Sequence, residues 1–287
     1  VLMIAGSGTS SLEAAVVNVT TKGDKVLVLS TGVFGHRFTE ICESYELDVH
    51  EFTSKWGHAF PLDEVIAHVK QHPDIKAVFS TFCETSTGVL NPVGELAQAV
   101  HAINDDIIVI ADGVSAIACA ETKMDEWGLD IVVTGSQKGF MLPTGLAFIA
   151  VSDRAWKVIE QNDTKGYYLD LTKHRDALDK GNTPFTPALG LFHGLDAVLD
   201  QLEDEGVEEV YARHTLMRDM TRAALKALDV NLLVEDAYAS PSVTAVAPTD
   251  FDAQAFRKVL KEDFNIDVAS GLDKMTDTIF RIGHMGY

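Results

Sequence analysis

Short runs of apolar and β-branched residues alternate with helix-length segments over the first half of the chain. Seven such runs lie at residues 1–5, 25–30, 47–52, 77–83, 106–113, 130–136 and 146–152. Strands separated by helix-length segments are typical of a mainly parallel sheet that helices cover on both faces. The pattern therefore predicts an α/β fold with a seven-stranded, mainly parallel sheet.

The pattern loosens from about residue 153. A polar passage over 153–184 predicts helices and loops, and 188–228 predicts one long helix. The C-terminal part predicts short strands and one further helix: strands at 230–234, 242–248, 264–269 and 278–284, and the helix at 252–263. We expect two domains, a large α/β domain over 1–185 and, over 186–287, the linking helix with a small C-terminal α+β domain.

Charge and composition narrow the class of protein. The formal net charge is −20, which argues against nucleic acid or an anionic membrane as a partner, because both would be repelled. No apolar run approaches the roughly 20 residues that a membrane span needs, and no basic segment with a cleavage site precedes an apolar stretch at the N-terminus. We expect a cytoplasmic protein.

The three cysteines are Cys42, Cys83 and Cys119. They lie far apart in the sequence and in apolar surroundings, which favours reduced, buried thiols over disulfides or a metal site. The sequence shows no metal-binding pattern, so we expect no metal.

The candidate chemistry lies where the predicted strands end, because ligands of a parallel sheet bind beyond the carboxyl ends of its strands. The stretch "AGSGTSSLEAAVVN" is a glycine-rich turn that opens a helix. The amides and dipole of such a turn suit an anion, above all a phosphate. A plain tight turn with a Ser or Thr cap explains the same letters.

Three further residues at strand ends each allow two explanations. Asp112 ends a strand expected to be buried, where a carboxylate needs a partner; it is either a helix N-cap or the counter-ion of a protonated ring nitrogen. Phe34 is either a core residue or the face on which a flat ring stacks. Lys138, in "GSQKG", is either solvated or an amine that forms a Schiff base.

The order of the pieces resembles a known family. The segments "GSGTSSLEAAVVN", "GVFGHR", "CETSTGVLNPV", "IADGVSAIACAE", "DIVVTGSQKGFMLPTGLAFIAVS" and "TIFRIGHMG" are similar to those of class V aminotransferases of pyridoxal phosphate (PLP) fold type I, in the alanine–glyoxylate and serine–pyruvate branch. The resemblance runs from Ser7 to Gly286. It implies PLP as the cofactor and transfer of an amino group from a small L-amino acid, alanine or serine, to glyoxylate or pyruvate.

The resemblance also implies roles for single residues. Lys138 matches the lysine that holds the cofactor covalently and then moves protons, and Asp112 matches the partner of the pyridine nitrogen. Phe34 matches the aromatic residue stacked on the ring, and Thr85 lies where a hydroxyl approaches the phenolic oxygen. The residues that match the phosphate-binding turn are Ser7, Gly8 and Thr9, and Gln137 matches a further residue that binds the phosphate.

Two matches concern the partner subunit and the substrate. Thr186 resembles a threonine that reaches the phosphate of the neighbouring subunit's cofactor, which implies a homodimer. Arg281 matches the arginine that grips the substrate carboxylate in a bidentate fork.

The chain departs from the family pattern at its ends and near Thr186. Family members usually carry a segment ahead of the first strand and a closing helix after "RIGHMG", so we expect both ends to be truncated. Thr183 stands where relatives often have an aromatic residue.

Two alternatives stay open. A lyase or desulfurase of the same fold is one, although desulfurases resemble one another in a histidine before the cofactor lysine and a mobile catalytic cysteine loop, whereas this chain has Gln137 and no cysteine after Cys119. The other is a non-catalytic, truncated paralogue that acts as a binding module.

Overall fold

A seven-stranded sheet forms the centre of the protein. The computed structural model describes residues 1–163 and 166–286. The strands are, in spatial order, β1 (Leu2–Gly6), β9 (Gly145–Val151), β8 (Ile131–Gly135), β7 (Ile108–Asp112), β4 (Ala77–Thr81), β2 (Lys25–Ser30) and β3 (Asp48–Thr53). From β8 to β3 all pairs are parallel, whereas β9 runs antiparallel to both its neighbours. The predicted seven-stranded, mainly parallel sheet is confirmed.

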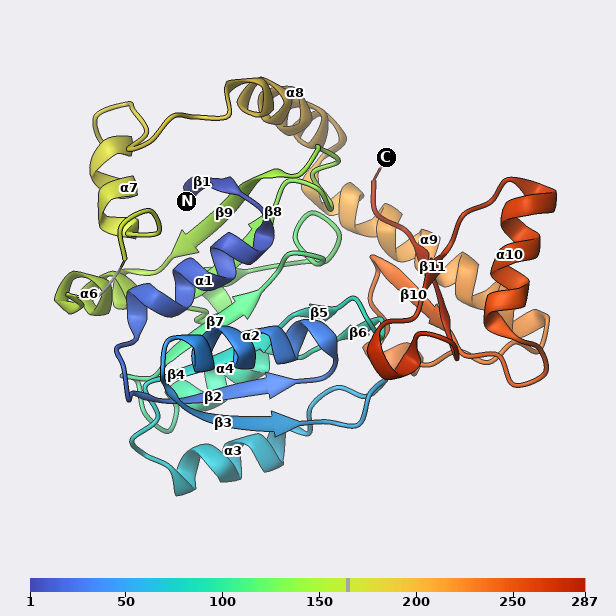
Figure 1. Cartoon of the computed structure of the whole chain (residues 1–287), viewed down its shortest axis with the longest axis horizontal. Coiled ribbons are helices and arrows are strands. Elements are labelled where there is room, and N and C mark those ends of the chain that lie inside the picture. Colours follow the sequence, from blue (N-terminus) through green and yellow to red (C-terminus); the bar gives the residue numbers. More distant parts are fainter. Residues whose placement is uncertain (164–165, 287) are drawn as a thin grey trace.

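Helices cover both faces of this sheet (Figure 1). One face carries α1 (Gly8–Val19), α2 (Val33–Ser44) and α6 (Asp153–Gln161), and the other carries α3 (Leu62–Gln71) and α4 (Val93–His101). Alternation along β2 divides its side chains between the two cores, with Val26 and Val28 in the first and Leu27 and Leu29 in the second. Burial on both faces explains why the central strands are apolar throughout.

The connecting segment contains two helices where the sequence predicted one. After α7 (Leu171–Leu178), α8 (Leu189–Glu205) and α9 (Val207–Ala227) meet at Gly206, which has φ +88° and ψ 132°. This backbone conformation is favourable for glycine and incompatible with a continuous α-helix. The prediction of a single long helix over 188–228 was therefore wrong.

A small antiparallel sheet lies beside the large one (Figure 1). Its order is β10 (Val243–Val246), β12 (Phe280–Gly283) and β11 (Ala269–Ser270). The helix α10 (Ala253–Phe264) packs on this sheet, and the ring centroids of Phe256 and Phe280 are 5.3 Å apart. The shorter elements are α5 (Met124–Trp127) and the two-stranded ribbon of β5 (Cys83–Glu84) and β6 (Val89–Leu90).

Two of the predicted C-terminal strands are wrong or shorter than expected. Residues 230–234 contribute only an isolated bridge between Leu232 and Val246. In 264–269, α10 continues through Phe264 and ends at Asn265, whose left-handed conformation (φ 55°) closes the helix. Only Ala269 of that segment pairs with the sheet.

Candidate active site

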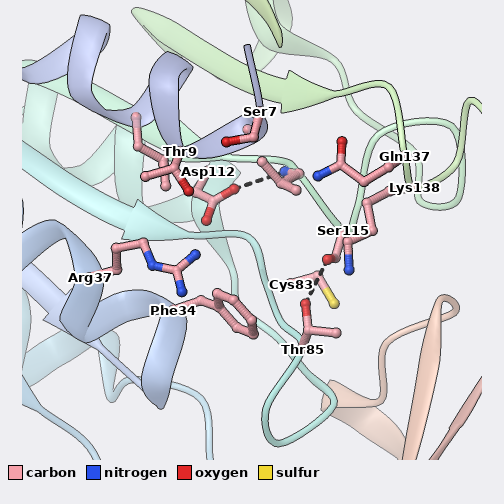
Figure 2. Close-up of a pocket in the computed structure, with 13 residues that line it drawn as sticks. Ser7, Thr9, Phe34, Arg37, Cys83, Thr85, Asp112, Ser115, Gln137 and Lys138 are labelled. Carbon is pink, nitrogen blue, oxygen red and sulfur yellow. Dashed lines mark hydrogen bonds between the residues drawn. The ribbon is translucent and has the colours of Figure 1, made fainter. Parts of the chain in front are cut away.

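A cavity of about 260 Å³ opens at the carboxyl ends of the strands (Figure 2). Its walls come from the β1–α1 turn, the first turn of α2, the β5 strand, the segment after β7 and the segment after β8. Eight of the ten residues predicted to form the site line it: Ser7, Gly8, Thr9, Phe34, Thr85, Asp112, Gln137 and Lys138. The topology brings them together from positions up to 131 residues apart, because the strand ends share one edge of the sheet.

The β1–α1 turn forms one end of the cavity. Ser7 is the N-cap of α1, and its side chain makes no capping hydrogen bond, which leaves the hydroxyl available to a ligand. A Cβ atom on Gly8 would lie 2.8 Å from Val114 Cγ2, so only glycine fits there. The first amides of a helix have no intrahelical partners, and the helix dipole adds positive potential. This end suits a phosphate.

Gln137 supports the same assignment. Its Oε1 atom is buried and has no hydrogen-bond partner among the described residues. An amide oxygen only accepts hydrogen bonds, so the group of Gln137 that can bind a phosphate is its Nε2 amide nitrogen, which donates. Gln137 lies beside the glycine turn, on the side of the cavity that suits the phosphate (Figure 2).

Asp112 is the last residue of β7 and is only 4% exposed. Its Oδ1 accepts a hydrogen bond of 2.8 Å from the Val114 amide. The side chain therefore caps a turn and not a helix, since the next helix begins only at Met124, and the helix N-cap explanation was wrong. Burial raises the pKa of Asp112 to about 7, and the nearby Glu84 carboxyl adds to the rise. Burial makes the ionised form of this carboxyl group unfavourable. A cation placed beside it, such as a protonated ring nitrogen, would stabilise that form.

Lys138 follows β8 and is half-buried, with its ammonium group directed into the cavity (Figure 2). Burial lowers the pKa of Lys138, and the charge of Arg281 lowers it further. Small neighbours make room for this arrangement. A Cβ atom on Gly139 would lie 2.4 Å from the Ile117 carbonyl oxygen. A lysine with a lowered pKa is the form of amine that acts as a nucleophile or base.

Glu84, which had no role assigned from the sequence, holds the backbone at Phe34 in place. The buried Glu84 carboxylate accepts hydrogen bonds from the backbone amides of Phe34 (3.2 Å) and Gly35 (2.8 Å) at the start of α2. Arg37 lies one helical turn further on, with its guanidinium 4.8 Å from the centroid of the Phe34 ring. The i, i+3 spacing from Phe34 was the one sequence signal for Arg37.

Thr85 and two further residues form the side of the cavity nearest the small sheet. Thr85 Oγ1 donates to Ser115 Oγ at 2.6 Å. Cys83 Sγ lies 3.0 Å from Ser240 Oγ and 3.2 Å from Ser242 Oγ, so the segment before β10 closes this side. Burial raises the pKa of the Cys83 thiol to about 11. Cys42, Cys83 and Cys119 are all free and buried, as predicted.

The other two predicted site residues do not line the cavity. Arg281 lies on β12 at its edge, where Nη1 donates to the Thr85 carbonyl and Nε donates to the Ser270 carbonyl, both at 2.8 Å. Its remaining amino group, Nη2, has no partner in the described part of the chain. Thr186 is exposed and lines a separate small cavity with Tyr168 and Phe185.

Comparisons with known proteins identify the family. The family model described as "Aminotransferase class-V" matches residues 1–280. A serine–glyoxylate aminotransferase of Hyphomicrobium methylovorum is 37% identical over 100% of this chain and 72% of its own. A protein of Synechococcus named as the small subunit of a soluble hydrogenase is 41% identical over 100% of this chain and 75% of its own. The chain belongs to the class V aminotransferases.

The solved structures agree with this placement. The crystal structure of a ureidoglycine–glyoxylate aminotransferase from Bacillus subtilis superposes with a TM-score of 0.92 at 31% identity, over 99% of this chain and 74% of the other. The protein is therefore an aminotransferase of fold type I, a family that implies PLP as the cofactor, and the desulfurase and lyase alternatives are set aside. No helix among the described residues is long and apolar enough to cross a membrane.

Proposed function

We propose that this aminotransferase moves an amino group from a small L-amino acid, alanine or serine, to glyoxylate or pyruvate, using PLP bound at Lys138. The observation that carries the proposal is the meeting of Lys138, Asp112 and the Gly8 turn in one cavity. The relatives named above support glyoxylate as an acceptor, since it appears in the names of two of them. Their donors differ, so the donor rests on the resemblance alone.

The residues of the cavity fit PLP at each of its polar groups. The phosphate would accept hydrogen bonds from the open amides of the α1 turn and from Gln137 Nε2, and the ring nitrogen would face Asp112. Phe34 would stack on the ring, and the hydroxyl pair of Thr85 and Ser115 would lie near the phenolic oxygen. Lys138 would bind the aldehyde carbon.

Bound PLP would take up the electrons of the broken Cα–H bond and carry the amino group from donor to acceptor. The remaining chemistry belongs to the chain. Arg281 Nη2 would bind the substrate carboxylate and fix the orientation of the α-carbon. Burial lowers the pKa of Lys138, which favours the amine form. Its Nζ would move the proton from that α-carbon to the cofactor carbon that takes up the amino group, and would move it back in the second half-reaction. Asp112 would hold the ring nitrogen protonated.

The proposed activity is tested by incubating the full chain with PLP and a panel of donors and acceptors. We expect transfer from L-alanine or L-serine to glyoxylate or pyruvate, with ping-pong kinetics, because one site serves both substrates in turn. L-Aspartate tests the breadth of the donor site. Cofactor binding without transfer between any pair would contradict the proposal and favour a binding module.

The arginine at the cavity edge gives a test of substrate binding. Arg281→Ala should raise the KM of every amino acid donor about 10-fold to 150-fold, since a charge-assisted contact contributes about 1.5–3 kcal/mol. The cofactor should stay bound, because Arg281 does not line the cavity. Steady-state kinetics and absorbance spectra measure the two effects.

Arg257→Ala is the matched control for this variant. Arg257 also lies in the small sheet region, and its Nε donates to a backbone carbonyl, that of Val268, at 2.8 Å. The Arg257→Ala variant should leave the KM of every donor unchanged. If Arg281→Ala abolishes cofactor binding, or leaves KM unchanged, then Arg281 only joins Thr85 to Ser270 and the carboxylate binds elsewhere.

The protein is proposed to work as a homodimer. Several large apolar side chains on α8 and α9 are exposed in the single chain: Leu189, Leu199, Val207, Leu216 and Met220. Exposed apolar side chains of this kind are typical of a protein interface. Thr186 is exposed and does not line the cofactor cavity of its own chain. A residue that binds the cofactor of the partner subunit would be placed in this way.

We expect Thr186→Val, which removes the hydroxyl and keeps the shape, to weaken PLP binding about 2-fold to 12-fold, the effect of one hydrogen bond. The measurements are an absorbance titration with PLP and the mass in solution by light scattering. Thr183→Val is the control, since Thr183 Oγ1 donates to the nearby Phe185 carbonyl at 2.7 Å. A monomer with full activity would contradict the proposed dimer.

Two further proposals concern organisation and location. We propose a division after residue 185, because β10–β12 and α10 have a core of their own around Val246 and Phe280. A cytoplasmic location is also proposed, and the three free cysteines are compatible with a reducing compartment.

A further inference from the structure

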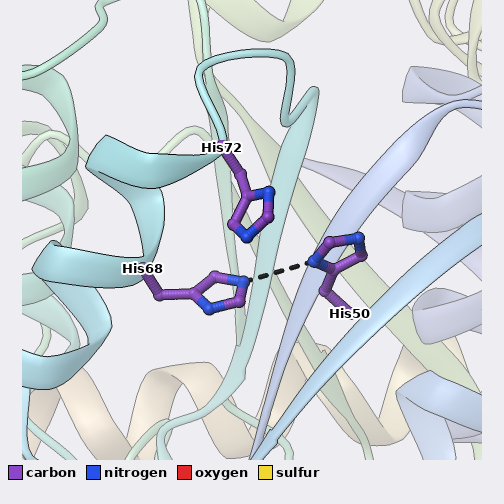
Figure 3. Close-up of side chains that lie close together, drawn as sticks. All are labelled: His50, His68 and His72. Carbon is purple, nitrogen blue, oxygen red and sulfur yellow. Dashed lines mark hydrogen bonds between the residues drawn. The ribbon is translucent and has the colours of Figure 1, made fainter.

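Three histidines meet at the edge of the large sheet, away from the cofactor cavity (Figure 3). His50 lies on the edge strand β3, His68 lies in the last turns of α3, and His72 is the residue at which α3 ends. Each of the three is half-buried, and one ring nitrogen from each lies within 4.8 Å of the others. None of them lines the cofactor cavity.

The spacing of the ring nitrogens is close to that of a metal site. His50 Nδ1 and His68 Nε2 are 3.3 Å apart, and two nitrogens bound tetrahedrally to zinc, each at about 2.0–2.1 Å, are also about 3.3 Å apart. The centroid of the His72 ring lies 4.5 Å from that of His68 and 4.7 Å from that of His50. Small rotations of half-buried rings would bring the third nitrogen into range.

The backbone holds all three side chains on one side of the sheet. In β3, His50 is directly opposite Leu27 of β2, and α3 is fixed to the same face by the buried Val65 and Val69. His68 and His72 are four residues apart, so they project from the same face of α3. The helix ends before Pro73, and the ion pair between Asp74 and Lys25 (2.6 Å) ties the following loop to β2.

The surroundings of the rings also suit a cation. Asp48 Oδ1 lies 4.0 Å from His50 Nε2, on the nitrogen that does not face His68. At 4.0 Å the carboxylate makes no hydrogen bond to the ring, but its negative charge favours a cation nearby. The formal net charge of −20 favours the approach of a cation to the protein.

We propose that His50, His68 and His72 bind one Zn²⁺ ion, each through one ring nitrogen, with water in the fourth position. Imidazole ligands suit Zn²⁺ and, in the same geometry, Co²⁺. The ion would link the edge strand β3 to α3. Because it binds the folded chain and not the unfolded one, it would stabilise the fold by mass action and leave amino-group transfer unchanged.

Zinc binding is measured on the full chain with its cofactor by competition with a chromophoric chelator. We expect one zinc ion per chain and a higher melting temperature when zinc is present. His68→Ala should weaken zinc binding at least tenfold, since loss of an outer partner alone costs about 10-fold to 100-fold. His58→Ala, an exposed histidine outside the cluster, is the matched control and should bind as the natural sequence does. Co²⁺ should give the visible bands of a tetrahedral site, and these should disappear in His68→Ala.

A second variant, His72→Ala, keeps the test decisive if His68→Ala fails to fold, as judged by circular dichroism. Equal zinc affinity in the natural sequence and both cluster variants would overturn the proposal. So would an equal loss in His58→Ala, because binding would then be distributed over surface histidines. In either case the three rings only pack against one another.

Discussion

Lys138→Ala should reduce amino-group transfer at least about 1,000-fold, because it removes the covalent anchor of the cofactor together with the group that moves the proton, and proton transfer alone contributes about 10²–10⁴-fold. The protein should still bind PLP through the α1 turn and Asp112, which the substitution leaves intact. The measurements are the rate of transfer and the absorbance of added PLP after dialysis.

Lys157→Ala is the control for this variant. Lys157 is exposed on α6, so its loss should leave both rate and spectrum unchanged. If Lys138→Ala keeps more than a tenth of the rate, another group performs the proton transfer, and the assignment of Lys138 fails.

Asp112→Asn should lower kcat about 100-fold or more, the usual effect of removing one preorganised charge from an active site. Without the carboxylate, the ring nitrogen loses the partner that holds its proton, while the amide side chain can still fill the space. Steady-state kinetics at saturating substrate measure the loss. Asp153→Asn is the control, because Asp153 is exposed, and it should leave kcat unchanged. Asp130 is unsuitable because its buried carboxylate accepts a hydrogen bond from the Val109 amide.

The same substitution predicts a pH effect on the protein without cofactor. The pKa of Asp112 is about 7 in the folded chain and 3.8 as its ordinary value, so between these values the folded state binds more protons than the unfolded one. Stability from this residue is therefore lost as the pH rises from about 4 to 7. At pH 8, cofactor-free Asp112→Asn should be more stable than the natural sequence, by at most about 4 kcal/mol.

Urea unfolding at pH 5 and pH 8 tests this expectation. The difference between variant and natural sequence should grow with pH. A difference that stays constant, or that grows toward low pH, would mean that Asp112 is already charged and paired in the cofactor-free protein.

The sequence predicted the sheet and most of the cavity for a physical reason. In a parallel sheet the strand ends share one edge, so Gly8, Asp112 and Lys138 could be placed together from their positions after apolar runs. Glu84 and Arg37 could not be assigned in this way. The role of Glu84 depends on how the β5 strand packs against the start of α2, which no local pattern records, and Arg37 had only its i, i+3 spacing from Phe34 as a signal.

Other features depend on conformation or on distant contacts. Gly206 breaks the predicted helix through a positive φ, which the sequence permits but does not require. The sequence suggested no metal site, because His50 is separated from His68 and His72 by a whole connection and only the packing of α3 on β3 brings them together. Arg281 was placed beside the substrate, and the structure places it at the cavity edge, bonded to two carbonyls.

Covalent binding of PLP to Lys138 can be measured directly. The direct measurement is to incubate the full chain with PLP, reduce the complex with borohydride, digest it and find the modified peptide by mass spectrometry. We expect one phosphopyridoxyl group per chain, on Lys138, in the peptide that contains "GSQKG". Modification spread over exposed lysines such as Lys157, or none at Lys138, would contradict it.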